Sequence, residues 1–196
     1  MKYQDGFTIV ELLIVVIIAA VLAAIAAPNL SDFVKNNART TRVNTMVTAL
    51  NYARGQAVTR NARVSLCKSS GPNFDNCAAV GTGNFEGGWI VFLDDGAIGG
   101  ITGGVDTVLS VFQPDMGGNA TLIGSKNVAV DPIGGLSYAN TGMGRDLEGG
   151  ATVVSANTVF RYCDDRGASK ARGVVISPVG SVSLTKEIGS FGLGCP

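Results

Sequence analysis

Apolar residues form an almost unbroken block near the start of the chain. The block, GFTIVELLIVVIIAAVLAAIAAP, runs from Gly6 to Pro28, and its single charged residue is Glu11. A helix over residues 7–27 would be about 31 Å long, which matches the roughly 30 Å hydrocarbon core of a bilayer. The pattern therefore predicts a transmembrane helix over 7–27 with one acid near its start.

A different periodicity follows Pro28, which lacks an N–H group and should kink or loosen the helix. Apolar residues then recur at spacings of three and four, while bases and asparagines occupy much of the other face. These apolar positions are Leu30, Phe33, Val34, Val43, Met46, Val47, Leu50, Ala53 and Ala57. We predict one long helix over residues 7–60, whose second half packs an apolar stripe on a globular domain.

Short β-rich runs follow the helix and are separated by Gly, Asn, Asp and Pro. The runs span residues 63–68, 88–93, 106–112, 120–124, 127–131, 135–139, 152–163, 172–177 and 181–185. Most of the 27 glycines fall between the runs, which indicates many tight turns. The sequence therefore predicts an α+β fold, in which the helix packs on an antiparallel sheet or sandwich formed by residues 61–196.

The charged residues balance overall but are unevenly distributed. The 196 residues include 15 bases, 15 acids and no His, so the molecule as a whole is not an electrostatic binder of nucleic acid. From residue 33 to residue 74 there are bases but no acid. These bases are Lys35, Arg39, Arg42, Arg54, Arg60, Arg63 and Lys68. The run indicates a solvated helix face, or a face that meets anionic lipid head groups or an acidic partner.

The residue types argue against an enzyme. Without His, the chain has no Ser-His-Asp or Cys-His pair and no His-ligated metal. The glycine cluster at 81–88 lacks the spacing of a phosphate-binding loop. Trp89 is interpreted as a packing residue, and Asp94-Asp95 and Asp164-Asp165 as turn residues, because neither acidic pair has the spacing of a calcium loop. We expect no catalytic residue, cofactor, metal or small-molecule substrate.

The four cysteines are not arranged as C-x-x-C, and their even number favours two disulfides in an exported domain. Three pairings are possible. We favour Cys67–Cys77 and Cys163–Cys195, because each pair is close in sequence and closes a separate loop. A metal site formed by all four cysteines is the alternative.

The position of Glu11 helps to decide between a secretory signal, a plain membrane anchor and a functional helix for the apolar block. A cleaved secretory signal fits poorly, because the leader MKYQDG contains an acid and Pro28 would directly follow the cut. A plain membrane anchor leaves Glu11 unexplained. A charge deep in a bilayer costs roughly a few kcal/mol, so an acid at this depth indicates a function.

The segment GFTIVELLIVVIIAAVLAAIAAPNL closely resembles the N-terminus of type IV pilins and type II secretion pseudopilins. The resemblance implies a leader over residues 1–6, cleavage by a prepilin peptidase between Gly6 and Phe7, and N-methylation of Phe7. It also implies that Glu11 neutralises the N-terminal amine of a neighbouring subunit, and that Pro28 provides a flexible break. Losing one partner of such a desolvated pair costs about 3–5 kcal/mol.

Three further segments resemble the GspH/FimT/FimU group of minor pilins and pseudopilins. They are NYARGQAVTRNARVSLC at 51–67, GGWIVFLDD at 87–95 and YCDDRGASKARGVVISPVGSVSL at 162–184. The resemblance implies a helix joined to β-sheets, in a structural protein at the tip or initiation complex of a pilus or pseudopilus.

One departure from this group concerns DNA. Members similar to FimT carry two arginines near the C-terminus that are associated with DNA binding, and Ser181 and Ser183 occupy those positions here. Losing two phosphate-contacting cations weakens electrostatic attraction to DNA. Arg166, Lys170 and Arg172 form a nearby basic group, so DNA contact stays open but is not favoured.

Together these features predict a FimU-like minor pilin. We expect it in the bacterial inner membrane with its head in the periplasm, and then in a type IV pilus near the tip. Its expected partners are other minor pilins, the major pilin, the prepilin peptidase and membrane lipid. We expect it to promote pilus assembly, and with it adhesion and twitching motility. The alternatives are a GspH-like minor pseudopilin of a type II secretion system and a FimT-like DNA-binding pilin for natural transformation.

Overall fold

One long helix and two antiparallel sheets make up the computed structural model. It describes residues 6–79, 84–96, 100–114, 116–117, 119–126, 131–147, 158–186 and 194–195. The chain divides into two compact units, Met1–Thr40 and Thr41–Pro196. We call the second unit the head, and it includes the C-terminal part of the helix.

The helix α1 spans Ile9–Arg60, as the apolar periodicity predicts. It continues through Pro28 without a break in its helical assignment, so a kink at Pro28 stays a prediction. At its C-terminus Asn61 adopts a left-handed conformation with φ of 53°. The amides of Asn61 and Ala62 donate to the carbonyls of Val58 and Ala57 at 3.3 and 3.2 Å. This is a Schellman motif, in which Asn takes the place of the usual Gly.

Two five-stranded sheets form the rest of the head, and the strand pairs within them are antiparallel. The first sheet has the order β3-β2-β1-β6-β7 and the second has the order β10-β9-β8-β4-β5. The strands of the first sheet are β1 (Val64–Lys68), β2 (Trp89–Leu93), β3 (Thr107–Phe112), β6 (Gly135–Tyr138) and β7 (Gly144–Asp146). Those of the second are β4 (Thr121–Lys126), β5 (Asp131–Pro132), β8 (Thr158–Cys163), β9 (Arg172–Ile176) and β10 (Val182–Thr185). Two short 3-10 helices, Phe85–Gly87 and Ala168–Lys170, lie in the connections.

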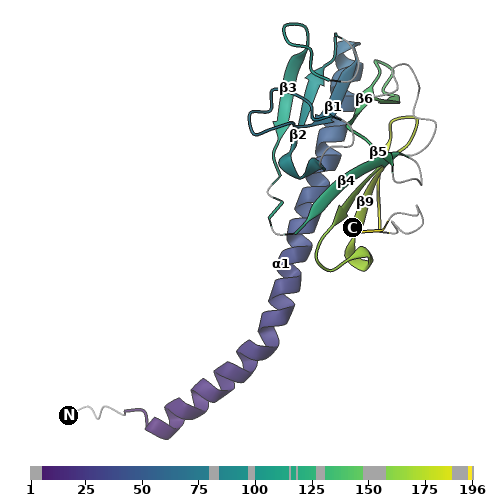
Figure 1. Ribbon diagram of the computed structural model, residues 1–196. Coiled ribbons are helices and arrows are strands. Elements are labelled where there is room, and N and C mark those ends of the chain that lie inside the picture. Colours follow the sequence, from purple (N-terminus) through teal and green to yellow (C-terminus); the bar gives the residue numbers. More distant parts are fainter. Residues whose placement is uncertain are drawn as a thin grey trace. The chain divides into compact units, whose positions relative to one another are not determined.

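The helix packs against both sheets through one hydrophobic core (Figure 1). Met46, Leu50 and Ala53 are fully buried on the helix side, as their spacing predicts. The first sheet supplies side chains such as Leu66 and Val91, which oppose each other across β1 and β2. The second sheet supplies side chains such as Phe160, Tyr162 and Val174. Burial of this apolar face fixes the C-terminal part of α1 within the head.

The strands found in the structure confirm the predicted α+β fold and most of the expected runs. Part of two expected runs, residues 127–130 of 127–131 and residues 152–157 of 152–163, lies outside the described residues. The short strand β7 was not predicted, because a charged three-residue segment carries no alternating pattern. It forms because Leu136, Ser137 and Tyr138 of β6 present an open edge to Asp146, Arg145 and Gly144.

Candidate functional site

The N-terminal segment that resembles a processing site is exposed. The Phe7 side chain is 85% exposed, and no atom lies within 4 Å of the position that a Cβ on Gly6 would occupy. Both residues precede the first helical residue, Ile9. The segment around Gly6 and Phe7 is thus exposed and not part of the helix.

Glu11 lies in the first turn of α1, and Thr8 caps that turn. The Glu11 amide donates to Thr8 Oγ1 at 3.2 Å, and the Leu12 amide donates to the Thr8 carbonyl at 3.2 Å. The cap was not among the sequence predictions, although Thr8 and Glu11 have the T-x-x-E spacing of a capping box that signals it. The helix dipole also favours a carboxylate at this end.

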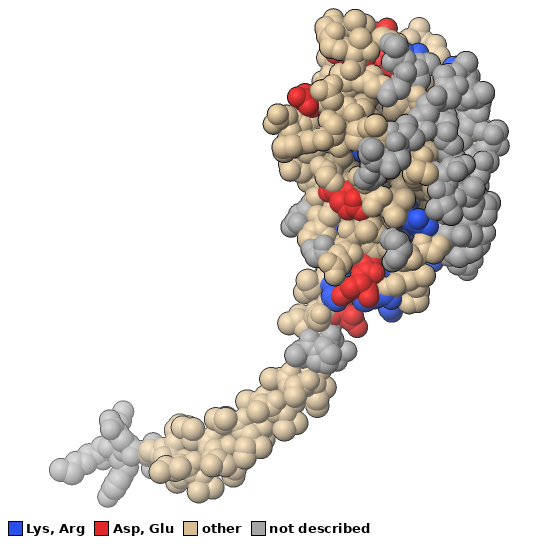
Figure 2. All heavy atoms as spheres, viewed as in Figure 1, with Lys and Arg blue, Asp and Glu red and all other residues tan. Residues whose placement is uncertain are grey.

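The rest of the first half of α1 presents apolar side chains to its surroundings. Large side chains from Ile9 to Ile25 are between about half and nearly fully exposed, and the face seen in Figure 2 lacks charge along these turns. Within the described residues, α1 is the one helix long and apolar enough to cross a membrane. So large an apolar surface needs lipid or other apolar helices around it. The side chains of Ala27, Pro28 and Asn29 lie outside the described residues.

Two disulfides join the cysteine pairs that the sequence spacing favours. Cys67 bonds to Cys77, and Cys163 bonds to Cys195. The first pair ties the loop after β1 to a small second cluster that includes Ile90 and Phe92, with Phe74 packed against it. The second ties the C-terminal segment to the end of β8. No described cysteine is free, which removes the alternative of a four-cysteine metal site.

Arg54 joins the two sheets, a role that the sequence did not indicate. From α1 it donates to the Gly142 carbonyl at 3.0 Å and to the Val179 carbonyl at 3.1 Å. Gly142 lies in the turn between β6 and β7, and Val179 in the turn between β9 and β10. Arg54 therefore holds one hairpin of each sheet against the helix, a structural role in addition to the partly solvated position expected for it.

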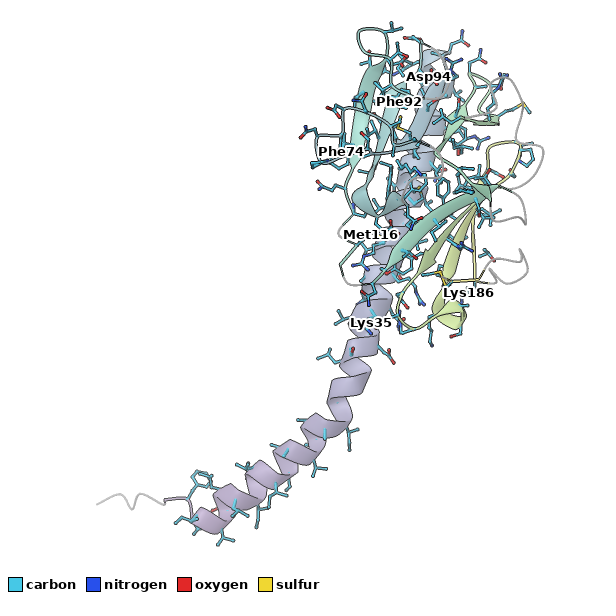
Figure 3. The ribbon with its side chains drawn as sticks, viewed as in Figure 1. Lys35, Phe74, Phe92, Asp94, Met116 and Lys186 are labelled. Atoms are coloured by element: carbon cyan, nitrogen blue, oxygen red, sulfur yellow. A yellow bond between two sulfur atoms is a disulfide. The ribbon has the colours of Figure 1, made fainter. Side chains whose placement is uncertain are left out.

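Other bases of the acid-free run also bind within the head. The guanidinium of Arg42 donates to the Tyr162 hydroxyl at 2.7 Å and lies 5.9 Å from the centre of that ring. Arg63 pairs at 2.7 Å with the buried Asp94. Asp94 is labelled in Figure 3. Asp94 is therefore the buried partner of a base, a role beyond the turn position expected for it. The ion pair with Asp94 neutralises the charge of Arg63, whereas Arg42 keeps its positive charge beside Tyr162.

The basic group near the C-terminus is only partly available. The Arg166 guanidinium pairs with the Asp164 carboxylate at 2.6 Å, and both side chains are mostly buried. Arg172 is half-buried and donates to the Ala171 carbonyl at 2.7 Å, while Lys170 is exposed. Ser181 hydrogen-bonds to Ser177 at 2.6 Å in the turn that precedes β10, and Ser183 is an exposed residue of that strand.

Trp89 is fully buried and stacks on Phe112 with 6.2 Å between ring centres, which confirms its interpretation as a packing residue. Among the described residues, no group of three or more His, Cys, Asp or Glu side chains is placed to hold a metal ion.

Comparison with known proteins gives two family matches. The family described as "Type II transport protein GspH" matches residues 42–180, and the "Prokaryotic N-terminal methylation motif" matches residues 1–27. Together they span residues 1–27 and most of the head.

A curated relative and a solved structure are also similar. A "Fimbrial protein" of Pseudomonas aeruginosa is 45% identical over 58 residues, which are 30% of this chain and 37% of that protein. The match thus spans little more than a third of the relative. The crystal structure of the type IV minor pilin FimU of Pseudomonas aeruginosa has a TM-score of 0.55 at 16% identity. It covers 83% of this chain and 96% of that chain, and it shows a shared fold.

Proposed function

Because this chain belongs to the GspH family, in the group of GspH/FimT/FimU-type minor pilins, we propose that it is a structural subunit of a type IV pilus. The observation that carries the proposal is a carboxylate, Glu11, in the first turn of a helix whose side chains are otherwise apolar and exposed. Such a surface is stable when lipid or other pilin helices cover it.

Processing is the first step of the proposed role. A prepilin peptidase cuts between Gly6 and Phe7, which frees an amine on Phe7 that is then methylated. The match to the N-terminal methylation motif over residues 1–27 supports this step. Before assembly, the apolar half of α1 holds the protein in the inner membrane. The two disulfides suit a head in the oxidising periplasm.

Assembly is the second step. As the helix leaves the membrane and packs among neighbouring helices, Glu11 pairs with the N-terminal amine of an adjacent subunit. Both charges lie in apolar surroundings, so an unpaired one costs about 3–5 kcal/mol. The pair thereby sets the axial register of the helix. The head then docks other minor pilins and bridges to the major pilin near the tip, promoting pilus formation, adhesion and twitching.

The test separates the charge of Glu11 from its place in the capped turn. Glu11→Ala removes the carboxylate, whereas Thr8→Ala removes the capping hydroxyl and keeps the carboxylate. The measurement is the amount of each mature variant in sheared pili, relative to its amount in the membrane. We expect Glu11→Ala to be strongly depleted from pili and Thr8→Ala to be nearly normal. Normal incorporation of Glu11→Ala would refute the role given to this residue.

A second candidate is a minor pseudopilin of a type II secretion system. The description of the matching family, a type II transport protein, favours it. Deleting the protein should then stop secretion of exported enzymes and leave twitching intact. The proposal of a pilus subunit expects the opposite pattern.

DNA binding is the less favoured role. Ser181 and Ser183 stand where FimT-like members have arginines, and Arg166 is already paired with Asp164. We expect the full-length protein in detergent micelles to leave DNA mobility unchanged in a shift assay. A tight complex that weakens with added salt would instead support the DNA-binding alternative.

A further inference from the structure

A polar pocket of about 270 Å³ lies in the head, where the end of α1 meets the turn between β6 and β7. Its lining consists of two arginines, two asparagines and two alanines. These residues are Asn61, Ala62, Arg63, Ala139, Asn140 and Arg145. No described acidic residue lines the pocket, and the pilus role does not involve it.

The two asparagines are held in place by backbone geometry and by each other. Asn61 is the left-handed residue of the Schellman motif that ends α1. Asn140 lies in the turn between β6 and β7 and donates from Nδ2 to Asn61 Oδ1 at 3.0 Å. This hydrogen bond links two segments of the pocket lining that are 79 residues apart in the chain.

The charge of Arg63 is neutralised on one side of the pocket. Its Nη2 atom donates at 2.7 Å to both Asp94 Oδ1 and the Gly96 carbonyl. Asp94 is in turn fixed by the hydroxyl of Ser65. The Nε atom of Arg63 is buried and has no hydrogen-bond partner within the described part of the head. Arg63 therefore keeps one free donor and little net charge.

Arg145 supplies the uncompensated charge. It lies on β7 opposite Ser137 of β6. Its Nε atom is buried, and no hydrogen bond or ion pair to its side chain is found in the described residues. Ser137 Oγ is also buried without a partner there. Among the described residues that line the pocket, the net positive charge is thus about one unit, and Arg145 carries it.

We propose that this pocket binds one oxyanion group, of the carboxylate or the phosphate class. Planar guanidinium groups match both anion classes through paired N–H bonds. The C-terminus of α1 carries a partial charge of roughly −0.5, which repels an anion. The amides of Asn61 and Ala62 already donate to the last carbonyls of the helix and so reduce this repulsion. The full charge of Arg145 therefore dominates.

The test uses the full-length chain in detergent micelles, labelled with ¹⁵N. The readout is the side-chain amide signals of Asn61 and Asn140, assigned with the Asn140→Ala variant. Sodium phosphate and sodium acetate are each titrated, with sodium chloride at equal ionic strength as the reference. We expect a saturable shift with phosphate, acetate or both, and which anion acts identifies the class.

Two matched variants test whether Arg145 carries the binding. Arg145→Gln should weaken it roughly tenfold to a hundredfold, the effect of losing a hydrogen bond to a charged group. Arg60→Gln removes an exposed base near the same helix end that bonds to Gln56, and binding should not change. Arg145→Lys keeps the charge without the planar donors and should bind more weakly than the native chain. Circular dichroism checks that each variant is folded.

The proposal is overturned if phosphate and acetate act no differently from chloride. It is also overturned if folded Arg145→Gln and Arg145→Lys both bind as the native chain does. Neither result bears on the pilus role, because the pocket and the Glu11 segment are tested separately.

Discussion

Gly180 lies against the carbonyl of Gly142, so closely that a Cβ on Gly180 would overlap the Gly142 oxygen. Gly180 also has a φ of 79°, which disfavours any side chain. This contact brings the turn between β9 and β10 onto the turn between β6 and β7, and Arg54 binds a carbonyl in each turn. The two sheets thus meet where the backbones of two glycines are in contact and no side chain fits between them.

Gly180→Ala should therefore destabilise the head by about 2–4 kcal/mol, the sum of the left-handed strain and the backbone overlap. Gly104→Ala is the matched control, because Gly104 has a similar φ of 80° but open space around it. The control should lose only about 1–2 kcal/mol. Urea unfolding of both full-length variants in detergent measures the difference, and equal losses would refute the packing argument.

Replacing Arg54 by Met should loosen the junction between the sheets. The change keeps an apolar stem and removes two hydrogen bonds to carbonyls, so we expect a loss of about 2–4 kcal/mol. Arg60→Met, near the same helix end, should change stability by less than about 0.5 kcal/mol. Hydrogen exchange of the two turns should accelerate in Arg54→Met alone.

Tyr138 should make the head lose stability in alkali. Burial raises the pKa of its hydroxyl well above the usual value near 10, and Arg54 offsets only part of this shift. The unfolded chain loses this proton at lower pH than the folded chain, so stability is complete below about pH 10 and falls as pH rises further. The slope approaches about 1.4 kcal/mol per pH unit.

Tyr138→Phe checks this assignment. The Tyr138 hydroxyl is buried with no hydrogen-bond partner among the described residues, so its removal should be neutral or slightly stabilising at pH 7. Above pH 10 the variant should lose less stability than the native chain. Urea unfolding at a series of pH values measures both, and parallel curves would contradict the prediction.

Removing the second disulfide should cost more than removing the first. Cys163–Cys195 joins residues 32 apart, against 10 for Cys67–Cys77, so it restricts the unfolded chain more. Chain entropy gives losses of about 3.7 and about 2.7 kcal/mol for the two double Cys→Ala variants. Denaturant unfolding under oxidising conditions gives the comparison. A reversed order would show that packing around the fully buried Cys67 outweighs chain entropy.

Periodicity and turn composition predicted the parts of the fold that depend on local pattern. The stripe through Met46, Leu50 and Ala53 predicted which helix face is buried, and alternating apolar residues placed most strands. Spacing along the chain also gave both cysteine pairs. The family resemblance, confirmed by the family match, rested on motifs at both ends of the chain.

Long-range contacts of charged residues could not be predicted in this way. Nothing in the sequence pairs Arg63 with Asp94, or Arg54 with the carbonyls of residues 142 and 179. These contacts depend on how two sheets fold back onto one helix. The pocket around Arg145 is hidden for the same reason, since its lining comes from segments far apart in the chain.

The helix α1 is continuous from Ile9 to Arg60, and the side chains of its last third pack in the hydrophobic core of the head. A pulling force on the first half of the helix is therefore transmitted through the same polypeptide segment to Met46 and Leu50. Detaching the head would require exposing these fully buried side chains to water, and not merely parting a surface contact. The resistance of the subunit to pulling is therefore set by the stability of the hydrophobic core of its head.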